Sequence, residues 1–345
     1  MLAAGSREFA TDQAGVVLVI RALPVFSDIE LAARRIAGEA VVTPLLENVK
    51  LNGLVGGRVF IKAECLQRTG SFKFRGAWNC ISKLDPAVHT GGVVAYSSGN
   101  HAQGVAAAAQ LRGVPALIVM PEDTPEIKKA NTKAYGAEVV TYDRATESRE
   151  EIANHYTAKR KAVLVPPFEH PDIIAGQGTC GLEIVNALQG RGIVLDDMLV
   201  NCSGGGLTAG VALAFSEKSP STKVYTVEPE GFDDYARSLR SGVREKNPRS
   251  SGSICDALLT PQPGEMTFAM NKGRLGEGYA VSEGEVRRAV RFAFETLKLV
   301  AEPGGAVGLA AVLSGKVDAK ARNTGIILSG GNVDAALFCE ILAGG

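Results

Sequence analysis

A lysine flanked by two phenylalanines is the residue whose setting first suggests chemistry. Residues 70–76 read GSFKFRG, with Lys73 between Phe72 and Phe74 and a glycine at each end. A lysine amine can form an imine with an aldehyde, and after release it can act as a base. A lone lysine between aromatic residues is more often an ordinary surface side chain. The segment therefore leaves a choice between a chemical group and a surface residue.

The glycine-rich segment SGGGLTAG (203–210) is the second place where residue types suggest a ligand. It follows a predicted strand and opens a predicted helix. Consecutive glycines let backbone N–H groups point into one concavity, and the helix N-terminus adds positive potential. A phosphate dianion fits such a concavity without any basic side chain. No G-K-[ST] sequence follows, which excludes a Walker loop.

Two other interpretations of this segment stay open. Gly204, Gly206 and Ala209 match the G-x-G-x-x-A dinucleotide pattern, and Glu228 ends the next predicted strand 24 residues after Gly204. Against a nicotinamide site, that pattern usually opens its domain, whereas roughly 200 residues of alternating strands and helices precede it here. The segment can also be a tight turn without a ligand. Pyridoxal 5'-phosphate (PLP) carries an aldehyde and a phosphate, so this one cofactor would explain both Lys73 and the glycines.

Predicted strands alternate with predicted helices along most of the chain. This alternation indicates an α/β fold with parallel sheets and ligand sites at the carboxyl ends of the strands. Lys73, Asn100, Gly204–Gly206 and Ser329 then lie at strand ends or in turns that can converge on one cleft. The predicted strands are 57–64, 92–98, 115–121, 137–143, 197–203, 223–230 and 324–332. The predicted helices are 99–113, 124–136, 146–159, 207–218 and 282–300.

Residues 282–300 have the clearest helical period. Apolar side chains recur there at spacings of four, three, four and three residues, which places them on one helix face. These side chains are Val286, Val290, Ala293, Leu297 and Val300. Ser282 followed by Glu285 forms a capping box at the start of the predicted helix.

Composition and charge restrict the class of partner. The chain has 345 residues, 46% of them hydrophobic, and equal numbers of basic and acidic residues, 37 each. Because the net charge is zero and no basic block occurs, a nucleic-acid partner is not expected. No apolar run approaches about 18 residues, so a membrane span is not expected either. The run AGVVLVIRALPVF (14–26) is short and interrupted by Arg21, and we interpret it as an N-terminal tail or an edge strand.

The cysteine pattern indicates reduced thiols in a cytoplasmic protein. No two cysteines form a C-x-x-C pair, and none clusters with histidine at zinc spacing. Most lie in apolar or small-residue surroundings, where buried free thiols are expected. The six are Cys65, Cys80, Cys180, Cys202, Cys255 and Cys339.

Several stretches together resemble one family. They are KAECLQRTGSFKFRGA (62–77), SSGNHAQGVA (97–106), IAGQGT (174–179), SGGGLTAG (203–210), VEPEGFDD (227–234), VAEPGGAVGLAA (300–311) and LSGGN (328–332). In this order they resemble the fold-type II PLP enzymes, in particular the serine/threonine dehydratase and serine racemase family. The resemblance covers the chain from about residue 24 to its end.

The resemblance implies a tryptophan synthase β-like fold. Two open twisted, mostly parallel sheets flanked by helices would hold the cofactor in the cleft between two domains. Residues 1–91 and 171–345 would form the large PLP-binding domain, and residues 92–170 a small domain inserted in it. A homodimer is also implied. The chain ends soon after LSGGN, so no C-terminal regulatory domain is expected.

The resemblance also assigns cofactor roles. Lys73 would hold PLP as an imine, with Phe72 packed near the ring. Asn100 would bind the 3'-oxygen, Ser329 would face the pyridine nitrogen, and Glu302 would lie at the cofactor. The backbone amides that would hold the phosphate belong to Gly204, Gly205, Gly206 and Leu207. Taken singly, a helix-capping Asn100 and a turn serine at 329 are the simpler interpretations.

The implied reaction is elimination of water from a small hydroxy-amino acid, L-threonine or L-serine. The substrate carboxylate would dock on backbone amides and hydroxyls of Ser97, Ser98, Gly99, Asn100 and His101. Released Lys73 would remove the α-proton as a general base. A neutral serine at 329 makes the ring a weaker electron sink, which favours immediate loss of the β-hydroxyl. The products would be a 2-keto acid and ammonia.

Ser98 leaves the branch of the family open. Threonine dehydratases of this family usually have alanine in this position, and the racemase and hydroxyaspartate-dehydratase branch has serine. There the serine can exchange a proton with the substrate Cα, although it can also serve only to bind the carboxylate. The alternatives are therefore a hydroxyaspartate dehydratase or serine racemase on the same scaffold. A nicotinamide-dependent oxidoreductase and a binding protein without activity are the rivals from other classes.

The stretch EPEGFDD also matches that branch's metal site. Carboxylate oxygens of Glu228 and Asp234 and the backbone carbonyl of Phe232 would be the protein ligands. Oxygen ligands of this kind suit Mg²⁺ or Ca²⁺. A solvated acidic turn is the alternative.

Overall fold

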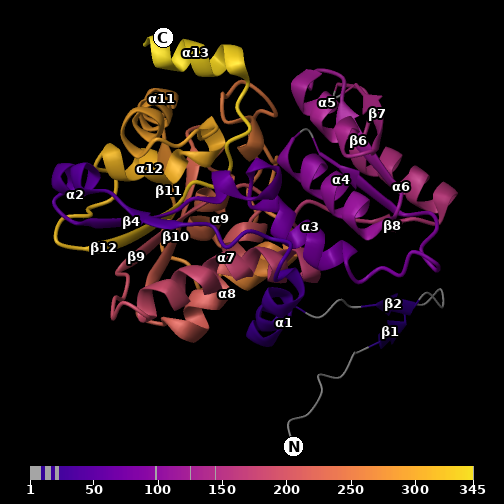
Figure 1. Ribbon diagram of the computed structural model, residues 1–345, viewed down its shortest axis with the longest axis horizontal. Coiled ribbons are helices and arrows are strands. Elements are labelled where there is room, and N and C mark those ends of the chain that lie inside the picture. The colour runs from indigo at the N-terminus through magenta and orange to yellow at the C-terminus, as the bar shows by residue number, and fades with distance from the viewer. Residues whose placement is uncertain are drawn as a thin grey trace, which may run out of the picture.

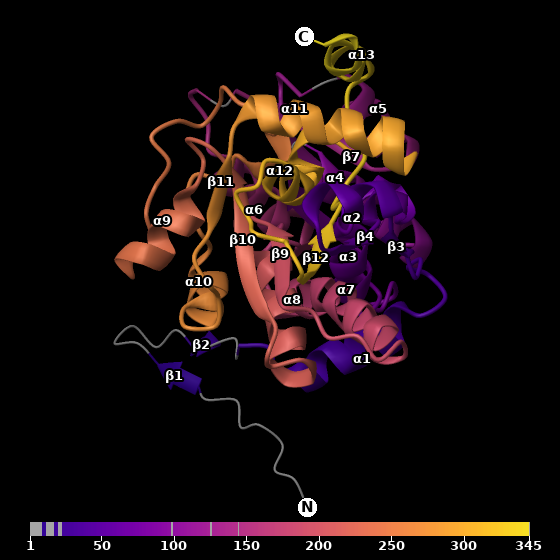
Figure 2. The ribbon, with the colours of Figure 1, turned by 90° about the vertical axis from the view of Figure 1, so that its left-hand side faces the viewer.

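Two separate sheets form the framework of the molecule (Figures 1 and 2). The structure is a computed structural model that describes residues 9–11, 17–19, 23–97, 99–124, 126–143 and 145–344. One sheet has six strands and the other has four, and helices cover the faces of both. The predicted α/β fold with two open, mostly parallel sheets is confirmed.

The six-stranded sheet has the strand order β11-β10-β9-β12-β4-β3. All neighbouring strands are parallel except β3, which pairs antiparallel with β4 at one edge. Val59 and Ile61 point into one apolar core and Phe60 into the opposite one, as a period of two requires. The strands are β3 (Leu45–Glu47), β4 (Arg58–Lys62), β9 (Asp197–Asn201), β10 (Lys223–Pro229), β11 (Tyr279–Val281) and β12 (Asn323–Ile327).

Helices cover both faces of this sheet. Helices α7 (Pro171–Gln189) and α8 (Gly206–Lys218) pack on the face that contains Phe60, and α11 (Glu283–Phe292) and α12 (Val307–Leu313) pack on the other. The predicted strands and the predicted helix after Gly204–Gly206 are confirmed within a few residues. The remaining helices near this sheet are α1 (Phe26–Ile36), α2 (Val49–Val55), α9 (Asp234–Ser241), α10 (Glu265–Asn271) and α13 (Ala335–Ala343).

The four-stranded sheet is parallel throughout, in the order β7-β6-β5-β8. Its strands are β5 (Val93–Tyr96), β6 (Ala116–Pro121), β7 (Glu138–Tyr142) and β8 (Val163–Leu164), and its helices are α4 (Asn100–Arg112), α5 (Glu126–Ala134) and α6 (Arg149–Arg160). Helix α3 (Lys73–Ile81) precedes these elements in the chain, yet Phe74 and Ala77 lie in the same apolar core as α4. The division into domains at residues 91 and 170 stays a prediction.

Helix α7 is the longest element that the sequence pattern did not predict. Its glycines lower helix propensity but permit close packing. A Cβ atom on Gly176 would lie 2.6 Å from the Cα atom of Gly76 in α3, and one on Gly210 in α8 would lie 2.5 Å from the backbone nitrogen of Gly178. Helices α3 and α8 can approach α7 this closely only because these positions lack side chains.

The predicted helix at 282–300 is correct in its first part and wrong at its end. The capping box is confirmed, because the Ser282 N–H donates to Glu285 Oε2 over 2.7 Å and the Glu285 N–H donates to Ser282 Oγ. Helix α11 continues into a π-helical turn (Ala293–Leu297) and stops at Lys298, whose φ is 62°. The π turn shifts the helical register, so Val300 is 45% exposed and Leu299 is buried instead.

The N-terminal run expected as a tail or an edge strand contains β2 (Val17–Val19), which pairs antiparallel with β1 (Phe9–Thr11). The other residues of that run before Leu23 lie outside the described part of the chain. Of the six cysteines, all free thiols, five are buried and Cys339 is exposed, as expected. None of the described helices combines the length and the apolar character that a membrane span requires.

Candidate active site

A cavity of about 130 Å³ lies where the carboxyl ends of the strands of both sheets meet. Ser97 follows β5, Gly204 follows β9 and Ser329 follows β12, so the turns after three parallel strands reach it. Ser98 lies outside the described residues. The other predicted cofactor and substrate residues all line the cavity: Phe72, Lys73, Ser97, Gly99, Asn100, His101, Gly204, Gly205, Gly206, Leu207, Glu302 and Ser329.

Lys73 is the first residue of α3 and opens onto this cavity. Its Nζ atom donates a hydrogen bond to the carbonyl oxygen of Pro167 over 3.0 Å and lies 5.2 Å from the centroid of the Phe72 ring. Burial lowers the pKa of Lys73 to about 8, although the nearby Glu302 acts in the opposite direction. The amine is therefore partly neutral near physiological pH, which a nucleophile or base requires.

The glycine segment forms a cradle that side chains would fill. Gly205 has a φ of 91°, in the left-handed region that favours glycine, and a Cβ atom on Gly204 would lie 2.4 Å from the Phe168 ring. The carbonyl oxygen of Gly204 accepts a hydrogen bond from Thr267 Oγ1 over 2.6 Å, which fixes the turn. Gly206 begins α8, so free N–H groups of the helix N-terminus face the cavity. These features fit a phosphate group.

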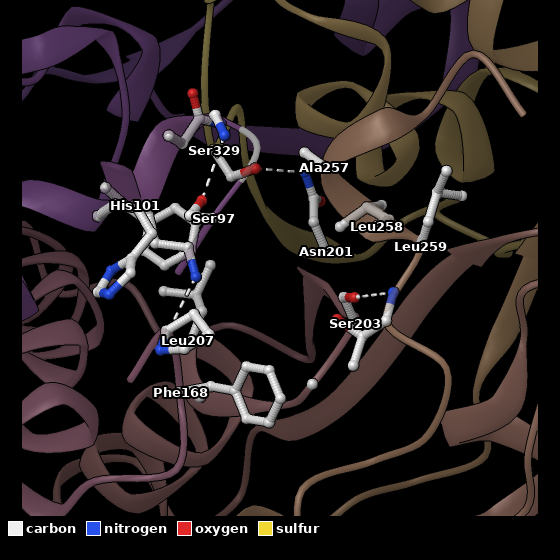
Figure 3. A pocket seen from close by; sticks show the side chains of 18 of the residues that line it. Ser97, His101, Phe168, Asn201, Ser203, Leu207, Ala257, Leu258, Leu259 and Ser329 are labelled. Atoms are coloured by element: carbon white, nitrogen blue, oxygen red, sulfur yellow. Dashed lines mark hydrogen bonds between the residues drawn. The ribbon is translucent and has the colours of Figure 1, made fainter. Parts of the chain in front are cut away.

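Asn201 holds the hydroxyl group of Ser329 (Figure 3). Its Nδ2 atom donates to Ser329 Oγ over 3.0 Å and also to the carbonyl oxygens of Gly304 and Gly305. Because Ser329 Oγ accepts from Asn201, its own proton remains available to donate to a ring nitrogen. Sequence reasoning missed Asn201, since an asparagine at the end of a buried strand has no distinctive pattern.

Asn100 joins two other polar residues at the cavity. Its Nδ2 atom donates to Glu302 Oε1 over 2.5 Å, and its Oδ1 atom accepts from Asn332 Nδ2 over 2.7 Å. The second hydrogen on Nδ2 is left for an oxygen of a ligand. Glu302 Oε2 is buried without a hydrogen-bond partner among the described residues. Burial, with the nearby charge of Asp256, raises the pKa of Glu302 to about 7.

His101 is a neutral residue in the cavity wall. Its Nε2 atom lies 2.9 Å from the carbonyl oxygen of Val165 and must donate to it, because a carbonyl only accepts. Burial, together with the charge of Lys73, lowers the pKa of His101 to about 3. Its Nδ1 atom, unprotonated and without a partner among the described residues, offers an acceptor and no positive charge. Any carboxylate bound at residues 97–101 therefore depends on backbone N–H groups and on the N-terminus of α4.

Further charged and aromatic side chains complete the cavity, and sequence reasoning missed them. Lys128 of α5 forms an ion pair with Asp256, and the Arg149 guanidinium lies 5.2 Å from the centroid of the Tyr96 ring. Phe168 lies across the cavity from Ser329 (Figure 3). In the sequence, a lysine and an arginine on predicted helices are indistinguishable from solvated surface charges.

The three predicted metal ligands lie outside this cavity. Both carboxylate oxygens of Glu228 accept backbone N–H groups, from Tyr235 over 3.0 Å and from Ala236 over 2.8 Å. Asp234 Oδ2 is buried without a hydrogen-bond partner among the described residues. Burial, with mutual repulsion, raises the pKa of Glu228, and burial raises that of Asp234 to about 7. Two adjacent buried carboxylates with one unused oxygen, followed closely by Phe232, fit a divalent cation.

Comparisons with known proteins give a consistent result. The family model described as pyridoxal-phosphate dependent enzyme matches residues 36–330. The chain is 41% identical over 324 residues to L-threo-3-hydroxyaspartate ammonia-lyase of Saccharomyces cerevisiae, across 93% of this chain and 97% of that protein. It is 38% identical over 323 residues to serine racemase of Schizosaccharomyces pombe, across 93% and 98%.

A solved structure extends the comparison to the fold. The crystal structure of a bacterial-strain threonine deaminase, designated T.th., superposes with a TM-score of 0.84 and 44% sequence identity, covering 90% of this chain and 99% of that one. The matched residues include the lysine helix, the glycine cradle and the strand that precedes Ser329. The chain belongs to the fold-type II pyridoxal-phosphate enzymes, in the serine/threonine dehydratase and serine racemase family.

Proposed function

We propose that the protein is a PLP-dependent ammonia-lyase that eliminates water from a hydroxy-amino acid, with L-threo-3-hydroxyaspartate as its favoured substrate. The observation that carries the choice of substrate is the pair of cations, Lys128 and Arg149, in the cavity wall. A second carboxylate on the substrate would have a cationic partner there, whereas threonine and serine carry no group that needs one. The similarity to hydroxyaspartate ammonia-lyases of yeast and Pseudomonas supports this choice.

The residues of the chain divide the work as follows. PLP, when bound, supplies an electron sink for the charge that develops at the substrate Cα. Lys73 holds the cofactor and, once released, takes the α-proton, and its lowered pKa suits that exchange. The amide groups at the start of α4 (Asn100–Arg112) hold the substrate α-carboxylate, because the N-terminus of a helix attracts anions.

Ser329 and Asn201 favour elimination. A hydroxyl that donates to the ring nitrogen leaves that nitrogen without the full proton a carboxylate partner would maintain. Charge at Cα is then poorly stabilised, so rapid loss of the β-hydroxyl is favoured over a long-lived carbanion. The product from hydroxyaspartate, after water and ammonia have been exchanged, is the four-carbon 2-keto acid.

L-Threonine and L-serine are the second candidate substrates, and a specific observation favours them. Ala257, Leu258 and Leu259 form an apolar part of the cavity wall, which suits a methyl or methylene group. Serine racemisation is a third candidate, supported by Ser98 in the sequence and by the similarity to serine racemases.

The test is a direct comparison of substrates on the purified holoenzyme. Keto-acid formation should be fastest, as kcat/KM, with L-threo-3-hydroxyaspartate and slower with L-threonine and L-serine. Lys73→Ala should abolish all three activities while the protein stays folded. Equal or greater kcat/KM with threonine or serine would overturn the preference, and D-serine formed from L-serine would add racemase activity.

We also propose the Glu228–Phe232–Asp234 site as a Mg²⁺ or Ca²⁺ site, a homodimer as the assembly and the cytoplasm as the location. The orphan oxygen of Asp234 supports the metal site, and the free thiols support a reducing compartment. Addition of Mg²⁺ or Ca²⁺ after chelation should raise the Tm of the protein. The same addition should have no effect on Asp234→Asn, which removes a ligand charge.

A further inference from the structure

We propose that Asp256 is a built-in substitute for the second carboxylate of the substrate, which occupies Lys128 until a dicarboxylic substrate displaces it. The proposal rests on the proposed function, because it explains how the site distinguishes dicarboxylic from monocarboxylic amino acids. Lys128 comes from α5, beside the four-stranded sheet, and Asp256 begins a short 3₁₀ turn (Asp256–Leu258) beside the six-stranded sheet. Their ion pair joins the two sides of the cavity.

The lysine lies next to the segment that would receive the substrate. A Cβ atom built on Gly99 would lie 3.6 Å from Lys128 Nζ, so the ammonium group is adjacent to residues 97–101. A substrate whose α-carboxylate docks on that segment would bring its β-substituent within a few bonds of Lys128. A carboxylate at that β-position can therefore reach the ammonium group.

The two partners differ in their contact with water. The side chain of Lys128 is only 8% exposed, whereas that of Asp256 is 43% exposed. A buried ammonium group without an anion is strongly unfavourable, so Lys128 requires a counter-ion at all times. Asp256 can leave at little cost, because water can solvate its carboxylate as soon as the ion pair breaks. The exchange of one carboxylate for another is therefore the feasible event.

Displacement of Asp256 also affects the cavity wall. Ala257, Leu258 and Leu259 follow it directly and line the cavity, and the segment is fixed at its far end by the Thr260 N–H, which donates to Ser203 Oγ over 3.2 Å. Release of Asp256 frees the near end of this apolar wall. A monocarboxylic substrate leaves the ion pair and the wall in place.

The experiment measures binding of two amino acids that have no β-leaving group, L-aspartate and L-alanine. They differ only by the β-carboxylate, and their affinity for the holoenzyme is read from the change in the visible absorption of the cofactor. Asp256→Asn should tighten aspartate binding about threefold to tenfold and change alanine binding by less than about twofold. Lys128→Met should weaken aspartate binding about tenfold or more, with a much smaller effect on alanine.

Two variants serve as matched controls. Lys133→Met removes an exposed lysine from the same helix, and Asp318→Asn removes an exposed aspartate far along the chain; both should bind aspartate as the unchanged protein does. Equal changes for aspartate and alanine in Asp256→Asn, or no change for either, would overturn the proposal. If the aspartate-specific pattern appears but no hydroxy-amino acid is turned over, the proposed function fails and this inference stands.

Discussion

The glycine cradle depends on the absence of a side chain at one residue, Gly204. A methyl group there would lie 2.4 Å from the Phe168 ring, too close for contact. Gly204→Ala should weaken the affinity for PLP about tenfold or more, because the ring or the turn must move. Gly53→Ala is the matched control, since nothing lies within 4 Å of its added Cβ atom. Titration of each variant with PLP, followed by absorbance, would measure this, and unchanged affinity in Gly204→Ala would contradict it.

The lowered pKa of Lys73 predicts how cofactor uptake depends on pH. Only the neutral amine attacks an aldehyde, and burial lowers the pKa of Lys73 to about 8 from 10.5. The rate of PLP incorporation into cofactor-free protein should therefore rise with pH and level off above about pH 8. A rate that continues to rise up to pH 10 would show that the lysine keeps its ordinary pKa.

Residue types with distinctive chemistry were predictable from the sequence, and ordinary ones were not. Lys73 and the glycines at 204–206 have few structural explanations, so the sequence placed them correctly at one cavity. Lys128, Arg149 and Asp256 come from three separate elements, and only the fold brings them to that cavity. Their identity as site residues depends on long-range packing, which local patterns do not encode.

At the scale of elements, helix α11 shows where sequence periodicity fails. The apolar period predicted Val290 and Val300 on one buried face, but the π turn and the positive φ of Lys298 separate them. Val290→Ala should lower the free energy of unfolding by about 2 kcal/mol, the contribution of a fully buried valine. Val300→Ala should change it by less than about 0.5 kcal/mol, because Val300 is exposed. Denaturant unfolding of both variants would test this, and equal losses would restore the continuous helix.

Most strands were predictable because buried parallel strands are short, apolar and followed by turn residues. Helix α7 was not, since its glycines resemble a loop until the neighbours that require them are known. The antiparallel edge strand β3 also escaped prediction, because three residues carry too little pattern.

At the scale of the whole molecule, a buried ion network attaches the lysine helix to its surroundings. Arg75, two residues after Lys73, donates from Nε and Nη2 to Glu64 over 2.8 Å each and from Nη1 to Glu183 over 2.6 Å. Arg75 and Glu64 are fully buried. The network therefore joins α3 to the end of β4 and to α7, the elements that frame the cavity.

Arg75→Met should lower the free energy of unfolding by about 3–5 kcal/mol, because it leaves the Glu64 charge buried without a partner. The double variant with Glu64→Gln should recover part of this loss. Arg58→Met is the control, since the Arg58–Glu47 pair is exposed and contributes no more than about 1 kcal/mol. Chemical denaturation at pH 7 would measure all three, and a loss in Arg75→Met as small as in Arg58→Met would contradict the network's role.

The central claim is that Lys73 carries the cofactor, and one measurement tests it most directly. The absorbance spectrum of the purified protein is recorded before and after borohydride reduction, and the reduced protein is mapped by peptide mass spectrometry. The account predicts a visible band that disappears on reduction and a pyridoxyl-phosphate adduct on Lys73. An adduct on another lysine, or no band and an unmodified Lys73 after PLP has been added, would contradict it.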